Sequence, residues 1–117
     1  MTERARLFVY GSLKRGFANH RVLRNADFLG ECRTAPHYRL FDLGAYPALA
    51  TDGALSITGE LYSYPVEHFS ELDAFEGPAY RRGTVALSDG STAEAYLLVT
   101  AECDEAIELH TDTWRAR

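Results

Sequence analysis

The stretch that decides the fold is Arg6-Leu7-Phe8-Val9-Tyr10-Gly11-Ser12-Leu13-Lys14-Arg15-Gly16, an apolar run that ends at a glycine and then turns basic. Residues 7–10 are large aliphatic, β-branched and aromatic residues next to charged ones, which predicts a buried strand. Gly11 can adopt backbone angles closed to other residues and lets a ligand approach closely, so the amides around Ser12 and Leu13 can face a bound oxygen. The end of this strand is therefore a candidate site, and a plain turn is the alternative.

Length and composition limit the class of protein. The chain has 117 residues, and we expect one domain over 1–117 with an acidic C-terminal segment from about residue 101. Its apolar content of 46% and charged content of 25% are ordinary globular values. The net charge of −5 disfavours a nucleic-acid partner. No apolar signal region or window of ~20 apolar residues is present, so we expect a cytoplasmic protein with a small-molecule partner and no membrane contact. The sequence carries no signal for an oligomeric state.

Cysteines and histidines indicate no metal site. Cys32 and Cys103 form no CxxC pair, and we expect both to be buried or half-buried thiols rather than a disulfide or zinc ligands. No second His or Cys stands at metal-ligand spacing from any of the four histidines, His20, His37, His68 and His110.

Two segments have the pattern of short helices. Residues 20–26 predict one, with Asn19 as its N-cap. Residues 66–75 predict the clearer one, which starts after a proline and ends at Gly77-Pro78. Its apolar residues recur at helical spacing and should share one buried face: Val66, Phe69, Leu72 and Phe75.

Most of the other segments read as strands. They are predicted at 28–34, 37–43, 58–64, 80–87 and 93–99, and the turn-rich residues 88–91 should join the last two as a hairpin. From Ala101 onward we expect a short helix or a tail that Trp114 pins. Together these elements predict an α+β domain with a mostly antiparallel or mixed, strongly curled sheet and two short helices.

A second candidate for chemistry is Glu76, in Leu72-Asp73-Ala74-Phe75-Glu76-Gly77-Pro78-Ala79-Tyr80-Arg81-Arg82. It falls at the end of the predicted helix, where the negative pole of the helix dipole disfavours a carboxylate. If Phe75 also draws Glu76 toward the apolar side, both effects raise its pKa, as proton exchange with an amine requires. A solvated Glu is the alternative, and Glu71 and Asp73 are expected to be surface acids of the helix.

These segments resemble the γ-glutamylcyclotransferase-like family, and within it most the small γ-glutamylamine cyclotransferase branch. The resemblance covers roughly residues 5 to 100 and rests on several motifs in this order: Tyr10-Gly11-Ser12-Leu13, Lys14-Arg15-Gly16, Asn19-His20, Tyr46-Pro47, Gly59-Glu60-Leu61-Tyr62, Leu72-Asp73-Ala74-Phe75-Glu76 and Tyr80-Arg81-Arg82. One departure is the strand at 95–99, which lacks the paired aromatics of many relatives.

The resemblance implies a small barrel-like α+β fold whose cavity holds a γ-glutamyl group. It also implies a cofactor-independent enzyme that closes 5-oxoproline and expels an amine, when the α-amine of the γ-glutamyl group attacks its own γ-carbonyl. Glu76 would be the general acid and base. Gly11, Ser12 and Leu13 would offer amides to the α-carboxylate or the oxyanion, and Tyr10 would form a wall of the pocket.

Three matched positions carry open alternatives. Tyr46 and Tyr80 line the pocket by resemblance, whereas a tyrosine in a small β-domain is often simply packed with its hydroxyl satisfied. Arg82 binds a carboxylate by resemblance, and a structural ion pair is the equal alternative.

Two other functions also stay open. A module of the same fold could bind a small molecule without turning it over. A hydrolase using Ser12 or Cys32 as nucleophile is disfavoured, because neither has a base partner in a motif. The leaving amine cannot be read from the sequence.

Overall fold

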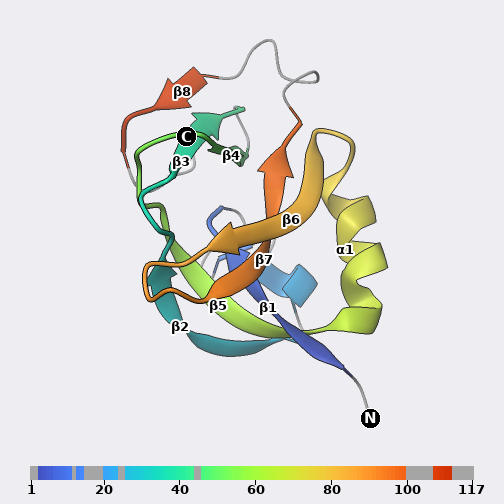
Figure 1. The fold of residues 1–117 in the computed structure, drawn as a ribbon. Helices are drawn as coiled ribbons and strands as arrows, with labels where there is room; N and C mark the ends of the chain where they lie inside the picture. Colours follow the sequence, from blue (N-terminus) through green and yellow to red (C-terminus); the bar gives the residue numbers. More distant parts are fainter. Residues whose placement is uncertain are drawn as a thin grey trace.

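The structure is a computed structural model, and it describes residues 3–11, 13–14, 20–23, 26–43, 46–99 and 107–111. Its centre is an eight-stranded mixed sheet with one α-helix beside it (Figure 1). The strands are β1 (Arg4–Val9), β2 (Asp27–Arg33), β3 (Tyr38–Asp42), β4 (Pro47–Thr51), β5 (Thr58–Pro65), β6 (Tyr80–Ala86), β7 (Thr92–Leu98) and β8 (Ile107–Leu109). The helical segments are η1 (His20–Leu23), η2 (Val66–His68) and α1 (Phe69–Glu76).

The sheet brings distant segments of the chain together at its centre. The strand order is β2-β5-β1-β7-β4-β3-β8, and β6 pairs with β7 as the predicted hairpin. The two pairings of β7 with β1 and β4 are parallel, through Leu7↔Glu94 and Leu49↔Leu97, and the other strand pairs are antiparallel. The first residues of β4 and the last of β1 therefore lie on either side of β7.

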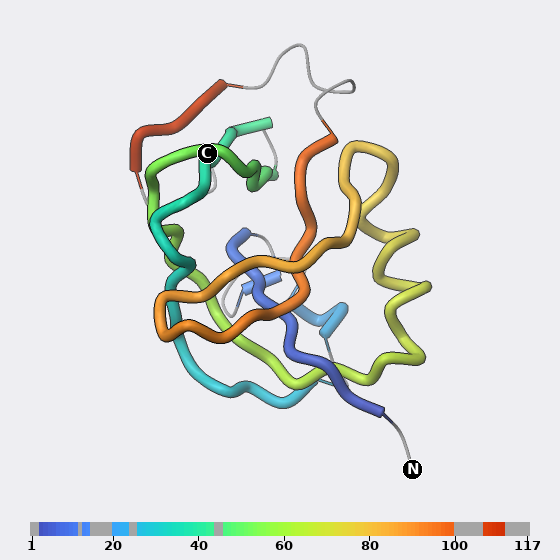
Figure 2. Tube along the Cα trace, viewed as in Figure 1, coloured from blue at the N-terminus to red at the C-terminus, as the bar shows by residue number. Residues whose placement is uncertain are grey.

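The sheet curls back on itself. A bridge between Thr34 and Leu87 joins the end of β2 to the β6–β7 hairpin, and the Ala35 amide donates to the Ala86 carbonyl at 2.9 Å. The tube in Figure 2 shows the hairpin crossing over β1 and β5. This confirms the predicted α+β fold with a curled, barrel-like mixed sheet.

β1 is buried on both faces, which explains its unbroken apolar run. Phe8 packs into one core cluster with residues of β3, β4 and β7. Leu7 and Val9 pack into a second cluster, which also contains Phe69 and Leu72 of α1. The second cluster thus holds the helix against the sheet.

The prediction of two short helices is confirmed for the second helix and wrong for the first. Only the second helix is α-helical in the described part of the chain, over Phe69–Glu76, after a turn of 3₁₀-helix at Val66–His68. The first is a 3₁₀ turn at His20–Leu23. A segment this short forms too few α-helical hydrogen bonds to offset the cost of nucleation.

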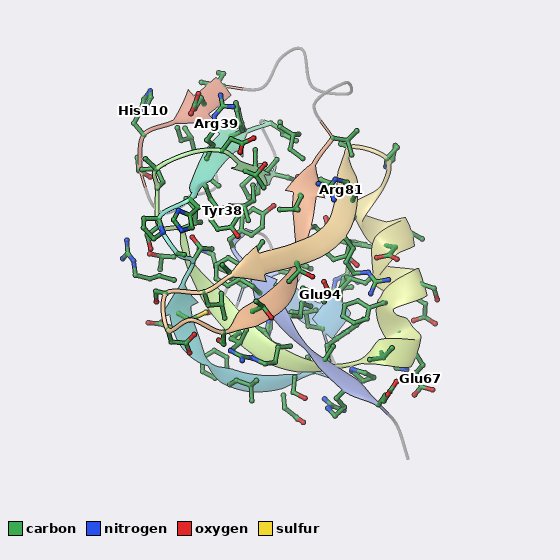
Figure 3. All side chains as sticks on the ribbon, in the orientation of Figure 1. Tyr38, Arg39, Glu67, Arg81, Glu94 and His110 are labelled. Carbon is green, nitrogen blue, oxygen red and sulfur yellow. The ribbon has the colours of Figure 1, made fainter. Side chains whose placement is uncertain are left out.

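Two further expectations need correction. In the acidic segment, Ile107–Leu109 is neither helix nor tail but the edge strand β8, which pairs with β3. An ion pair between Arg39 and Glu108 at 2.8 Å also joins the two strands. Figure 3 labels Arg39 on β3, beside β8. Residues 101–106, including Cys103, lie outside the described residues, as do Asn19 and Trp114. In the predicted helical segment, Phe69 and Leu72 of α1 are buried, but Val66 of η2 and Phe75 of α1 are 38% and 45% exposed.

Candidate functional site

A pocket opens where β1 ends, between the start of β4, the end of α1 and the strands β6 and β7. It is lined from β1 and the following turn by Phe8, Val9, Tyr10, Gly11 and Leu13. Its other walls come from four more segments: Tyr46, Pro47, Glu76, Tyr80 and Tyr96. The carboxylate of Glu76 is the charged side chain in this set, and it stands among aromatic and apolar groups.

Glu76 occupies the last position of α1, and Gly77 ends the helix. Gly77 has φ of 83°, in the left-handed region that favours glycine, and its amide donates to the Asp73 carbonyl at 3.2 Å. Burial raises the pKa of Glu76 to about 7, because desolvation disfavours the charged form. The predicted help from Phe75 is wrong, since that side chain is 45% exposed. The pocket itself provides the burial.

Tyr10 closes the floor of the pocket. Its hydroxyl donates to the Tyr96 carbonyl at 2.5 Å and accepts the Leu49 amide at 3.0 Å. Burial, followed by the nearby Tyr80 and Glu76 charges, raises the pKa of Tyr10 well above its usual value. Tyr10 is therefore neutral, and its hydroxyl joins the end of β1 to β4 and β7.

Gly11 is required by close approach rather than by unusual backbone angles. The positive-φ glycines of the described residues are Gly30, Gly77 and Gly90, so the predicted conformational role of Gly11 is wrong. A Cβ at Gly11 would stand 2.5 Å from Cγ of Pro47. The absence of a side chain lets β4 approach the turn and form the pocket wall.

The turn after β1 is held by two hydrogen bonds. The Lys14 amide donates to the Gly11 carbonyl at 3.0 Å, and Nδ1 of His20 lies 2.9 Å from the Leu13 carbonyl. Leu13 is buried in the pocket wall. Ser12, a predicted binding residue, lies outside the described residues.

The remaining predicted site residues, Tyr46, Tyr80 and Arg82, lie at different places relative to the pocket. Tyr46 lines the pocket with 47% of its surface exposed, so it lies at the mouth. Tyr80 lines it too, and its hydroxyl donates to the Pro47 carbonyl at 2.5 Å. Arg82 is outside the lining: its Nε contacts Asp73 at 3.1 Å and its guanidinium covers the Phe69 ring at 4.2 Å.

The sequence reasoning missed Pro47 as a wall and, above all, Tyr96. The Tyr96 ring is buried, and its hydroxyl donates to Oδ1 of Asp73 at 2.5 Å. Asp73, expected only as a surface acid, lies at the helix surface but bonds to both Tyr96 and Arg82. The one available signal was an aromatic residue in the strand at 95–99.

A metal site, a reactive cysteine and a membrane-spanning helix have little support in the described part of the chain. No group of three or more His, Cys, Asp or Glu side chains lies together there as a metal site would need. Cys32 is a half-buried free thiol, as expected, and burial raises its pKa. None of the helices described there is long and apolar enough to cross a membrane.

The fold and pocket define a small α+β protein with a half-buried acid, Glu76, in a tyrosine-lined pocket. Residues 7–116 match the family model described as gamma-glutamyl cyclotransferase, AIG2-like. The chain is 41% identical over 93 residues to a Vibrio cholerae protein with γ-glutamylcyclotransferase in its name, covering 78% of this chain and 79% of that protein. It is 39% identical over 92 residues to the human γ-glutamylaminecyclotransferase, covering 69% and 60%.

Solved structures agree. The AIG2-like protein of Mus musculus superposes with a TM-score of 0.77 at 25% identity, over 97% of this chain and 89% of that one. The chain therefore belongs to the AIG2-like γ-glutamylcyclotransferase family, as the sequence resemblance predicted.

Proposed function

We propose that this protein is a γ-glutamyl cyclotransferase that acts on a small γ-glutamyl amine or amide and releases 5-oxoproline and a free amine. The observation that carries the proposal is Glu76, a half-buried carboxyl in a pocket beside the turn that follows β1, with its pKa raised to about 7 by desolvation. An acid–base group works best when its pKa is near the working pH, and an ordinary surface Glu is far from it.

In the proposed reaction, Glu76 takes a proton from the α-ammonium of the substrate. The resulting amine attacks the γ-carbonyl carbon, the new ring C–N bond forms, and the bond to the leaving nitrogen breaks as Glu76 returns a proton to it. Over the whole reaction the attacking nitrogen loses two protons and the leaving nitrogen gains two, so protons balance and no water is consumed.

Binding is assigned to the turn and the tyrosine walls. The backbone amides of residues 11–13 would hold the α-carboxylate or the developing oxyanion. Tyr10, Tyr80 and Tyr46 would hold the glutamyl chain folded back, and ring closure in a fixed geometry gains much of its rate from orientation. Arg82, which contacts Asp73, is assigned a supporting place rather than direct binding.

The test is a screen of γ-glutamyl amino acids, γ-glutamyl-ε-lysine and γ-glutamyl amines with direct detection of 5-oxoproline. We expect turnover of at least one compound, and Glu76→Gln should lower its rate by ~10² to 10⁴ while 5-oxoproline still binds. Binding without turnover in the wild type would favour a non-catalytic module. Full activity of Glu76→Gln would refute the role of Glu76.

A further inference from the structure

The C-terminal turn of α1, which carries Glu76, has little apolar anchorage. The buried apolar residues of the helix, Phe69 and Leu72, lie in its first half. In the second half, Ala74 and Phe75 are exposed. Packing of apolar side chains therefore fixes the start of the helix but not the turn that presents the acid.

Polar contacts of Asp73 supply the missing anchorage. Oδ1 of Asp73 accepts the Tyr96 hydroxyl of β7 at 2.5 Å and contacts Nε of Arg82 on β6 at 3.1 Å. The same arginine covers the Phe69 ring of α1 at 4.2 Å. A carboxylate that accepts hydrogen bonds from two strands fixes the position of its helical turn along the helix axis and the rotation of that turn about the axis.

Tyr96 connects this anchor to the pocket. Its side chain is 4% exposed and lines the pocket with Glu76, and its carbonyl accepts the Tyr10 hydroxyl at 2.5 Å. Its hydroxyl donates a hydrogen bond to Asp73. Burial, followed by that hydrogen bond, raises the pKa of Tyr96, so Tyr96 stays neutral. Asp73 is thus connected to the pocket through Tyr96, which also accepts a hydrogen bond from Tyr10 at the pocket floor.

We propose that Asp73 is a positioning residue, which through Tyr96 and Arg82 holds the last turn of α1 so that Glu76 stays in the wall of the pocket. This inference rests on the proposed function only for its effect on rate. The titratable and charged groups that face this region are Asp73 and Glu76 of α1, Arg82 and Tyr80 of β6, Tyr96 of β7, Tyr64 of β5 and Tyr10, which follows β1.

The proposal predicts different behaviour for two substitutions at the same position. Asp73→Asn and Asp73→Ala both remove the negative charge three residues from Glu76, so their direct electrostatic effect on Glu76 is the same. Asp73→Asn keeps an oxygen that accepts the Tyr96 hydroxyl, and Asp73→Ala does not. A difference between the two therefore reports the positioning bond rather than the charge.

The measurement is a carboxyl NMR titration of Glu76 in the free protein, with thermal unfolding to check folding. We expect the pKa of Glu76 to fall by at least one unit more in Asp73→Ala than in Asp73→Asn, because the acid moves into water. The kcat of Asp73→Ala should fall ~10- to 100-fold below that of wild type, as expected for an acid displaced by about 1 Å. Asp73→Asn should keep most of the wild-type kcat.

A second pair keeps the test decisive if Asp73→Ala does not fold. Tyr96→Phe removes the same bond without changing any charge and should lower the pKa of Glu76. The matched control is Tyr38→Phe, which also removes a hydroxyl, the acceptor of the Ala86 amide, at a site well apart from α1 (Figure 3). Tyr38→Phe should leave that pKa unchanged.

Equal pKa values of Glu76 in the two Asp73 variants, or in Tyr96→Phe and wild type, would overturn the positioning role. The titration needs no substrate, so it separates the two claims. If wild type turns over no γ-glutamyl compound but the pKa still falls as expected, positioning stands and the proposed reaction fails.

Discussion

At the scale of single residues, Glu76 makes folding depend on pH. Its folded-state pKa of about 7 lies above the unfolded value near 4.3, so the folded state binds the proton more tightly. Stability contributed by the protonated acid is fully present below about pH 4.3 and is lost as pH rises toward 7. Above pH 7 the charged form of Glu76 costs on the order of 4 kcal/mol at most.

Glu76→Gln should therefore change the shape of the stability profile. Its urea unfolding free energy, relative to wild type, should rise between pH 5 and 8, because the neutral amide has no proton to lose. Glu71→Gln, at an exposed position of the same helix, is the control. A constant difference across this pH range would contradict the burial of Glu76.

Gly11 and Pro47 form the second residue-scale contact that can be tested. A Cβ at Gly11 would overlap the rigid Pro47 ring, so Gly11→Ala should lower the unfolding free energy by about 1–3 kcal/mol and weaken 5-oxoproline binding. Pro47→Ala removes the obstructing atoms, and the double variant should be more stable than the two single effects predict. Strictly additive effects would show that the close approach does not exist in solution.

At the scale of elements, the sequence predicted the strands whose formation depends on the residues within the segment itself. The strands around β1, β5, β6 and β7 follow from apolar runs ended by glycine, proline and turn residues. β8 did not, because the alternation in Ile107-Glu108-Leu109 is only three residues long, too short to indicate a strand. This strand depends on pairing with β3 and on the Arg39–Glu108 contact. The 3₁₀ turn at His20–Leu23 has helical composition but is too short to continue as α-helix.

The attachment of α1 gives a prediction at this scale. Leu72 is 1% exposed in the second core cluster, whereas Phe75 is 45% exposed, although helical spacing places both on one face. Leu72→Ala should lower the unfolding free energy by about 2–5 kcal/mol, and Phe75→Ala by well under half of that. Chemical denaturation of both variants tests this, and a larger loss from Phe75→Ala would contradict the observed face.

At the scale of the whole molecule, the site depends on connections that no local pattern contains. The family resemblance indicated Glu76, Tyr10, Gly11 and the turn, because these residues lie within motifs that can be recognised in the sequence. Pro47 and Tyr96 reach the pocket only because β7 runs parallel to both β1 and β4. Pairings between strands so far apart in sequence are decided by the complete core.

The central claim is that the nucleophile comes from the substrate and not from the protein. A matched pair of γ-glutamyl amides, one with a free α-amine and one N-acetylated, separates intramolecular cyclisation from hydrolysis by a protein nucleophile such as Ser12 or Cys32. The most direct measurement follows release of the same amine from both, with 5-oxoproline detected alongside. We predict release and 5-oxoproline from the free amine, at a rate that falls as pH drops below 7, and none from the acetylated compound. Release of the amine from the N-acetylated compound would contradict the cyclotransferase account.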